Sequence, residues 1–92
     1  MYVVLVYDIK TIDEYARVSN WVFKTCKKFL THIQNSVFEG DLNKTQFMNL
    51  KLQLKNYLRP KIDSCIIFKS NNNKWLSKEF LISEEDKTLN IL

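Results

Sequence analysis

The sequence predicts a single α+β domain in which two helices cover one face of an antiparallel sheet. Two observations carry this prediction. The chain has 92 residues, which is the size of one small domain. Its apolar residues switch between the alternation of a strand and the spacing of a helix, in the order strand, helix, strand, helix, strand, strand. That order is typical of a split βαβ arrangement.

The first predicted strand runs from Tyr2 to Ile9 and is rich in β-branched and aromatic residues. Residues on both of its alternating faces are apolar, so both faces of the sheet need to be covered at this strand. Two helices cover only one face, and a chain of this length has little left to cover the other. We therefore expect two copies to pack sheet against sheet as a symmetric homodimer.

Two segments have helical spacing. The first covers residues 11–30, with Thr11 or Asp13 as its N-cap. The second begins after Asn43, another good N-cap residue, and is expected to end at about Leu58.

The sequence leaves the number and bounds of the remaining strands open. Residues 32–42 are strand-like, and the sequence allows either a hairpin that turns at Asn35-Ser36 or one long strand bent at Gly40. Residues 64–69 predict the next strand, and residues 74–82 alternate enough for another.

The whole chain, residues 1–92, reads as one domain. Its single Gly and single Pro exclude a glycine-rich phosphate loop and a Pro-rich linker. Residues 83–92 are expected to form a mobile polar segment followed by a short terminal strand.

Cys26 and Cys65 have no second Cys or His at the spacing of metal ligands, and they are expected to be reduced thiols. With no signal peptide or membrane span evident, we expect a cytoplasmic protein.

Basic residues gather on the two predicted helices. Between Arg17 and Lys28, and again between Lys44 and Lys61, cations occur without any acid, and the net charge of the chain is +4. Spacings of four and seven residues place several of them on one face of each helix. Such a face is either simply solvated or binds phosphates. The nucleic-acid-binding candidates are Arg17, Lys24, Lys28, Lys51 and Lys55.

Asp8 is the main candidate for chemistry. It closes the first strand on the face that also carries Tyr2, Val4 and Val6. A carboxylate there costs desolvation unless it reaches solvent, a donor or a metal. Mg²⁺ prefers carboxylate oxygens, and a twofold axis would bring two Asp8 residues together as metal ligands and catalytic groups. The alternative is a strand-end acid that caps a helix or pairs with Lys10.

Three further residues are secondary candidates. Tyr7 precedes Asp8, and Ser36 lies in the strand-like segment without a base at motif distance. Glu39 is either a second carboxylate near the site or an acid that flanks a turn. The single histidine, His32, excludes a two-histidine acid–base site within one chain.

Two motifs occur in order along the chain. The first is Tyr2-Val3-Val4-Leu5-Val6-Tyr7-Asp8, followed by a basic helix; the second is Gln34-Asn35-Ser36-Val37-Phe38-Glu39-Gly40. Together they resemble the small CRISPR-associated spacer-acquisition family Cas2. Segments 63–68 and 74–75 extend the resemblance over nearly the whole chain. The resemblance implies a ferredoxin-like homodimer whose C-terminal strand crosses onto the partner's sheet. It also implies that Asp8 binds Mg²⁺, or Mn²⁺, at the dimer interface.

The resemblance implies two functions. Members are metal-dependent endonucleases on single-stranded RNA or double-stranded DNA, and they bridge two integrase dimers when the CRISPR system of antiviral defence acquires spacer DNA. The alternatives are a non-catalytic nucleic-acid-binding scaffold and a related family of toxin-type mRNA ribonucleases. The chain departs from the family at His32, where an arginine is common, and at Arg17, which stands where paired basic residues are common.

Overall fold

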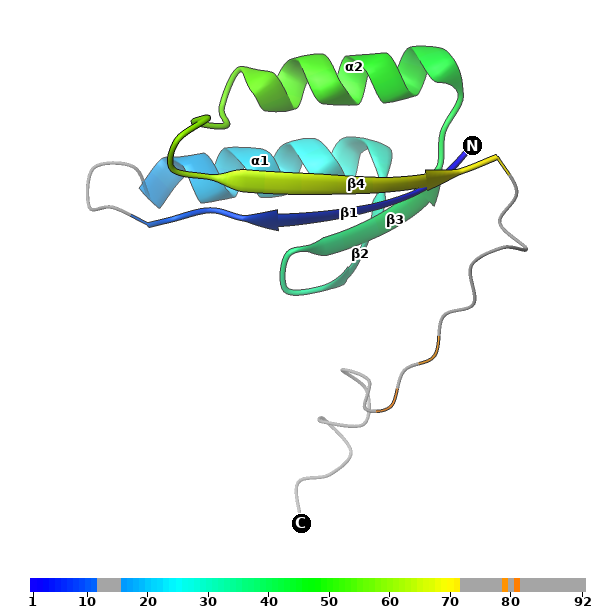
Figure 1. Cartoon of the computed structure of the whole chain (residues 1–92), viewed down its shortest axis with the longest axis horizontal. Helices are drawn as coiled ribbons and strands as arrows, with labels where there is room; N and C mark the ends of the chain where they lie inside the picture. Colours follow the sequence, from blue (N-terminus) through cyan, green and yellow to red (C-terminus); the bar gives the residue numbers. More distant parts are fainter. Residues whose placement is uncertain (12–15, 72–78, 80, 82–92) are drawn as a thin grey trace.

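The computed structural model describes residues 1–11, 16–71, 79 and 81, and shows two helices packed on a four-stranded sheet (Figure 1). The elements are β1 (Tyr2–Asp8), α1 (Ala16–Phe29), β2 (Thr31–Gln34), β3 (Val37–Asp41), α2 (Lys44–Lys55) and β4 (Ser64–Ser70). The predicted cap Asp13 and the terminal segment predicted over 83–92 lie outside the described residues. So does the strand predicted over 74–82, except for Glu79 and Leu81.

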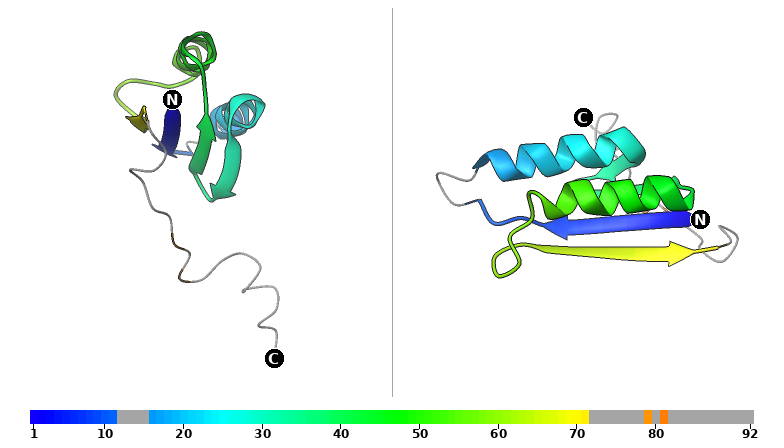
Figure 2. Two further views of the ribbon diagram at one scale, coloured as in Figure 1. Left: turned by 90° about the vertical axis from the view of Figure 1, so that its right-hand side faces the viewer. Right: turned by 90° about the horizontal axis from the view of Figure 1, so that it is seen from above.

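The four strands are antiparallel and stand in the order β2-β3-β1-β4. β1 is therefore central, with Val6 opposite Val37 of β3 on one side and opposite Ile66 of β4 on the other. Both helices lie on the same side of the sheet (Figure 2). This confirms the predicted α+β class with two helices on one face.

The core lies between the helices and the sheet. Val3, Leu5 and Tyr7 of β1 alternate inward and are buried, as the two-residue period of the strand requires. They meet buried side chains of both helices and of β3. The other members of this buried cluster are Val18, Val22, Cys26, Leu30, Phe38, Leu42, Phe47, Leu50 and Leu54. Each such aliphatic or aromatic side chain contributes about 1.5–3 kcal/mol of burial free energy.

The segment predicted over 32–42 is a hairpin, and the alternative of one strand bent at Gly40 is wrong. β2 and β3 turn at Asn35, whose φ of 42° lies in the left-handed region that asparagine tolerates. Gly40 instead continues β3, opposite Val3. A Cβ at Gly40 would lie 2.9 Å from Cδ2 of Leu30, so its small size lets β3 pass close beneath the end of α1.

α2 begins as predicted and ends earlier. The side-chain oxygen of Asn43 accepts from Gln46 N at 2.8 Å, and the side-chain oxygen of Gln46 accepts from Asn43 N at 3.0 Å, a complete capping box. The helix ends at Lys55 rather than Leu58, because Asn56 N donates to the carbonyl three residues back and tightens the last turn. Leu58 still packs against the core from the following loop.

Among the described residues, no helix has the length and apolar character needed to cross a membrane.

Candidate active site

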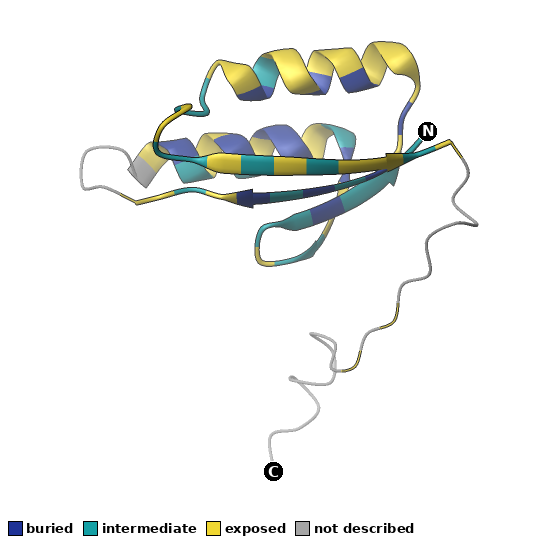
Figure 3. Cartoon of the chain, viewed as in Figure 1, coloured by how far each residue is buried: buried dark blue, intermediate teal, exposed yellow. Residues whose placement is uncertain are grey.

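The face of the sheet turned away from the helices carries a cluster of apolar side chains that is only partly covered. We call it the open face, and its members on the three strands β1, β3 and β4 share a side by register. They are Tyr2, Val4, Val6, Asp8, Val37, Glu39, Asp41, Ser64, Ile66, Phe68 and Ser70. Ile66 is 55% exposed and Phe68 58% exposed on the edge strand β4, which is high for large apolar residues, and β4 alternates visibly in exposure (Figure 3). Exposed apolar surface of this kind marks an interaction site.

Asp8 stands at one end of the open face. It is the last residue of β1, is exposed, and lies opposite Ser64, the first residue of β4. No hydrogen bond or ion pair joins its carboxylate to another residue in the described part of the chain, and none forms with Lys10. The structure thus places Asp8 as the sequence predicts, on the same face as Val4 and Val6, with its carboxylate toward solvent.

Tyr7 and Ser36 are brought together, but not with the Asp8 carboxylate. Tyr7 is 7% exposed and faces the helices, where its ring stacks on Phe38 with centroids 6.0 Å apart. Its backbone N–H donates to Ser36 O at 3.1 Å. Burial raises the pKa of Tyr7 above its ordinary value. Tyr7 is therefore a core residue that lies on the opposite face of β1 from Asp8.

Glu39 lies on the open face but far along it from Asp8. It is opposite Val4, four residues from Asp8, which is about 13 Å at the rise of a β-strand. Its carboxylate accepts a hydrogen bond from the Tyr2 hydroxyl. That bond, together with burial, raises the pKa of Tyr2 to about 12. Within one chain Glu39 is thus the partner of Tyr2 and not a second carboxylate beside Asp8.

The five basic candidates are exposed on the helix layer. Arg17, Lys24 and Lys28 project from α1, and Lys51 and Lys55 from α2. Because both helices cover the face opposite the open face, these cations and the Asp8 carboxylate lie on opposite sides of the sheet (Figure 2). The structure therefore does not gather them into one site.

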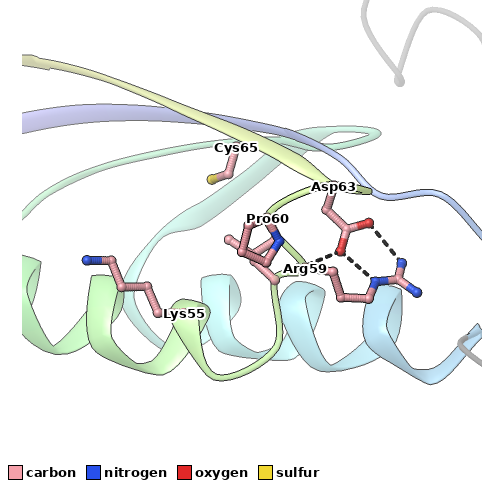
Figure 4. Close-up of a pocket in the computed structure, with 6 residues that line it drawn as sticks. Lys55, Arg59, Pro60, Asp63 and Cys65 are labelled. Carbon is pink, nitrogen blue, oxygen red and sulfur yellow. Dashed lines mark hydrogen bonds and ion pairs between the residues drawn. The ribbon is translucent and has the colours of Figure 1, made fainter.

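One cation of the basic segment from Lys44 to Lys61 is partly buried in an ion pair. Arg59 donates from Nε to Asp63 Oδ2 and from Nη2 to Asp63 Oδ1, both at 2.8 Å (Figure 4). The Asp63 side chain is fully buried and that of Arg59 is 18% exposed. The guanidinium holds the pKa of Asp63 below its ordinary value.

The pair of Arg59 and Asp63 borders a cavity of about 430 Å³ that is also lined by Lys55, Leu58, Pro60 and Cys65. The spacing of four residues between Arg59 and Asp63 could have indicated this ion pair from the sequence, since residues four apart are neighbours on a helix. Pro60 lies between them and interrupts a helix, so the sequence did not predict the pair.

The donor set for a metal is small. Within the part of the chain that the structure describes, no three His, Cys, Asp or Glu side chains stand close enough to hold an ion together. A single exposed carboxylate at Asp8 fits a hard cation that keeps most of its water ligands, as Mg²⁺ does. The residues present therefore fit a shared site better than a complete site within one chain.

The model of the family described as CRISPR associated protein Cas2 matches residues 1–78. The chain belongs to the Cas2 family. A protein of Fusobacterium nucleatum named CRISPR-associated endoribonuclease Cas2 is 50% identical over 94 residues, covering 100% of this chain and 87% of that protein. A protein of the same name from Methanosarcina acetivorans is 34% identical over 92 residues and covers 100% of both.

Solved structures agree with this Cas2 assignment. The crystal structure of Streptococcus pyogenes Cas2 at pH 6.5 superposes with a TM-score of 0.72 at 27% identity, covering 87% of this chain and 99% of that one. A second crystal structure, described as cas2, gives a TM-score of 0.64 at 40% identity, covering 74% of this chain and 71% of that one. The ferredoxin-like fold and the family that the two sequence motifs suggested are both confirmed.

Proposed function

We propose that the chain is a metal-dependent endoribonuclease of the CRISPR system, in which a homodimer brings two Asp8 carboxylates to one Mg²⁺ or Mn²⁺ ion. The observation that carries this proposal is the exposed Asp8 carboxylate at the end of a largely apolar open face. The names of the Fusobacterium and Methanosarcina relatives support the reaction class.

The dimer is argued from the open face. Ile66 and Phe68 leave a patch of apolar surface beside Val4 and Val6 that is favourable to remove from water. Packing two open faces together around a twofold axis places the same patch on both sides of the interface. Asp8 stands at one end of the face, so each copy would contribute one carboxylate.

The chemistry is hydrolysis of a phosphodiester. Water adds to phosphorus, the bond from phosphorus to one ester oxygen breaks, and the proton from water ends on the leaving oxygen. A bound Mg²⁺ would supply a lowered pKa for its water and neutralisation of phosphate charge. In this chain, Asp8 would hold the ion, and the apolar residues of the open face would hold the two copies together in a fixed alignment.

Asp8→Asn tests the proposal because it keeps the side-chain shape and removes the charge that holds the cation. Cleavage of single-stranded RNA, and of double-stranded DNA as a second substrate, should fall by about two orders of magnitude or more. The dimer should survive, since a neutral amide removes repulsion between two carboxylates. Asp41→Asn is the matched control, because Asp41 is exposed at the opposite end of the sheet. Cleavage that persists in Asp8→Asn, or falls equally in Asp41→Asn, would contradict the proposal.

We also propose a second function, as the dimeric bridge for the CRISPR integrase during spacer acquisition. The exposed cations of α1 and α2 support it, because they offer phosphate-binding surface on the side of the sheet away from Asp8. Spacer integration with purified integrase should therefore survive Asp8→Asn. Loss of integration in that variant with the dimer intact would reject the bridge and favour a purely enzymatic role.

The remaining alternatives are a non-catalytic scaffold and a toxin-type ribonuclease. The match to the Cas2 family model favours a CRISPR role over the toxin family. The scaffold alternative predicts no metal-dependent cleavage by the wild-type chain, which the same assay measures. We place either activity in the cytoplasm.

A further inference from the structure

The loop between α2 and β4 is closed on itself by hydrogen bonds. Ile62 N and Asp63 N both donate to Arg59 O, at 3.0 and 2.9 Å. Arg59 N in turn donates to Asp63 Oδ2 at 3.0 Å. The backbone that leads into β4 is thus held by its own hydrogen bonds and by the Asp63 carboxylate.

The side chains of Arg59 and Asp63 then form a bidentate pair inside this loop. Two parallel N–H···O bonds of 2.8 Å fix both the distance and the plane of the carboxylate (Figure 4). A buried ion pair adds little net stability after its desolvation cost, and its best use is to specify geometry. The geometry that it specifies here involves a third residue, from another part of the chain.

That third residue is Lys10, and the pair binds its backbone on both sides. Lys10 N donates to Asp63 Oδ1 at 3.2 Å, and Lys10 O accepts from Arg59 Nη2 at 2.8 Å. Lys10 lies two residues beyond Asp8, after the last pairing of β1 with β4. The ion pair therefore supplies the hydrogen bonds that the sheet no longer offers at this point.

These contacts fix the backbone on both sides of Asp8. On one side, Asp8 connects through Ile9 to Lys10 and across two hydrogen bonds to the ion pair. On the other side, Asp8 lies opposite Ser64, which directly follows Asp63. Because no other described side chain bonds the Asp8 carboxylate, its position depends on this backbone alone.

We propose that Arg59 and Asp63 are positioning residues for Asp8: their buried pair binds the backbone of Lys10, fixes the end of β1, and so sets the place at which the Asp8 carboxylate meets the metal ion. The inference rests on the proposed function, in which Asp8 is a metal ligand. It assigns to Arg59 a role different from that of the exposed lysines, which contact solvent.

Two mild variants test the role of the pair. Asp63→Asn keeps the shape of the side chain and removes its charge, and Arg59→Lys keeps the charge and removes the planar fork that makes two bonds at once. Asp41→Asn is the control: the same chemical change to a carboxylate that pairs with the N-terminal amine at 3.0 Å, at the other end of the sheet. Circular dichroism checks that each variant is folded.

Two readouts separate positioning from general stability. Hydrogen exchange of the Lys10 amide, followed by NMR, should speed up by about tenfold or more in both variants while amides in the middle of β1 stay protected. The dissociation constant for Mn²⁺, measured on the folded full chain, should rise about tenfold, as for a lost outer-shell partner of a metal ligand. Asp41→Asn should change neither.

The outcomes distinguish this inference from the proposed function. Unchanged Lys10 exchange, or unchanged Mn²⁺ affinity in both variants, overturns the positioning role even if Asp8→Asn abolishes Mn²⁺ binding. If Asp8→Asn itself leaves Mn²⁺ binding intact, the metal site and its positioning residues are both rejected. If either variant unfolds, the other variant decides by the same two readouts.

Discussion

Phe68 should carry a large share of the free energy of dimerisation. Its ring lies on the open face, opposite Val4, and is 58% exposed in the single chain. A phenylalanine offers about 200 Å² of burial, so about 115 Å² remains to be covered in each chain. At about 25 cal/mol per Å², complete burial is worth about 3 kcal/mol per chain and about 6 kcal/mol per dimer.

Phe68→Ala removes this surface and should raise the dissociation constant of the dimer by up to about four orders of magnitude. Sedimentation or light scattering over a dilution series measures the shift. The monomer should keep its fold, because an exposed ring contributes little to the stability of the single chain. Circular dichroism at the lowest concentration checks this point.

The matched control is Leu52→Ala. Leu52 is 59% exposed, almost the same as Phe68, but belongs to α2 on the other side of the sheet. Its loss should leave the dimer unchanged. A dimer that resists Phe68→Ala, or one that dissociates in Leu52→Ala, would refute the assignment of the open face as the interface.

Three further predictions concern charge. Replacing Lys51 and Lys55 together by Gln should weaken duplex DNA binding and lower the log–log salt slope by about two, as measured by fluorescence anisotropy; an unchanged slope would place phosphate binding elsewhere. Because the folded-state pKa of Asp63 is lowered, its carboxylate stabilises the fold above its unfolded pKa of about 3.9, and this contribution is lost as pH falls through the folded value. Asp63→Asn should therefore flatten the loss of stability in acid urea titrations. The raised pKa of Tyr2, about 12, means that its bond to Glu39 stabilises the fold fully below about pH 10 and is lost as pH rises toward 12. Glu39→Gln should return this tyrosine's spectrophotometric pKa toward about 10, and a titration that does not move would contradict the pairing.

Local chemistry was sufficient to predict the elements and the main candidate residue. The alternation of β1 follows from the period of a strand, so the outward direction of Asp8 beside Val4 and Val6 could be predicted without a structure. The cap at Asn43 depends on atoms within four residues, and it forms as predicted. The two motifs around Asp8 and Ser36 are also linear, which is why the family could be identified from them.

The choice between a hairpin and a bent strand over 32–42 was decided by tertiary structure. Both fit the same alternation, and pairing with β1 selects the hairpin with its turn at Asn35. The end of α2 likewise depended on how its last turn meets the loop that follows, which moved it back from Leu58 to Lys55.

The sequence by itself determined which way each side chain of a strand or helix points, and it placed Asp8 correctly for that reason. Only the tertiary structure decided which side chains meet: Glu39 bonds to Tyr2 and lies away from Asp8, and Tyr7 packs into the core. Arg59, one of the cations between Lys44 and Lys61, is partly buried against Asp63 and binds the backbone near Asp8. The direction of a side chain follows from the local backbone period, whereas its partner follows from strand register and chain reversal, which join residues tens of positions apart.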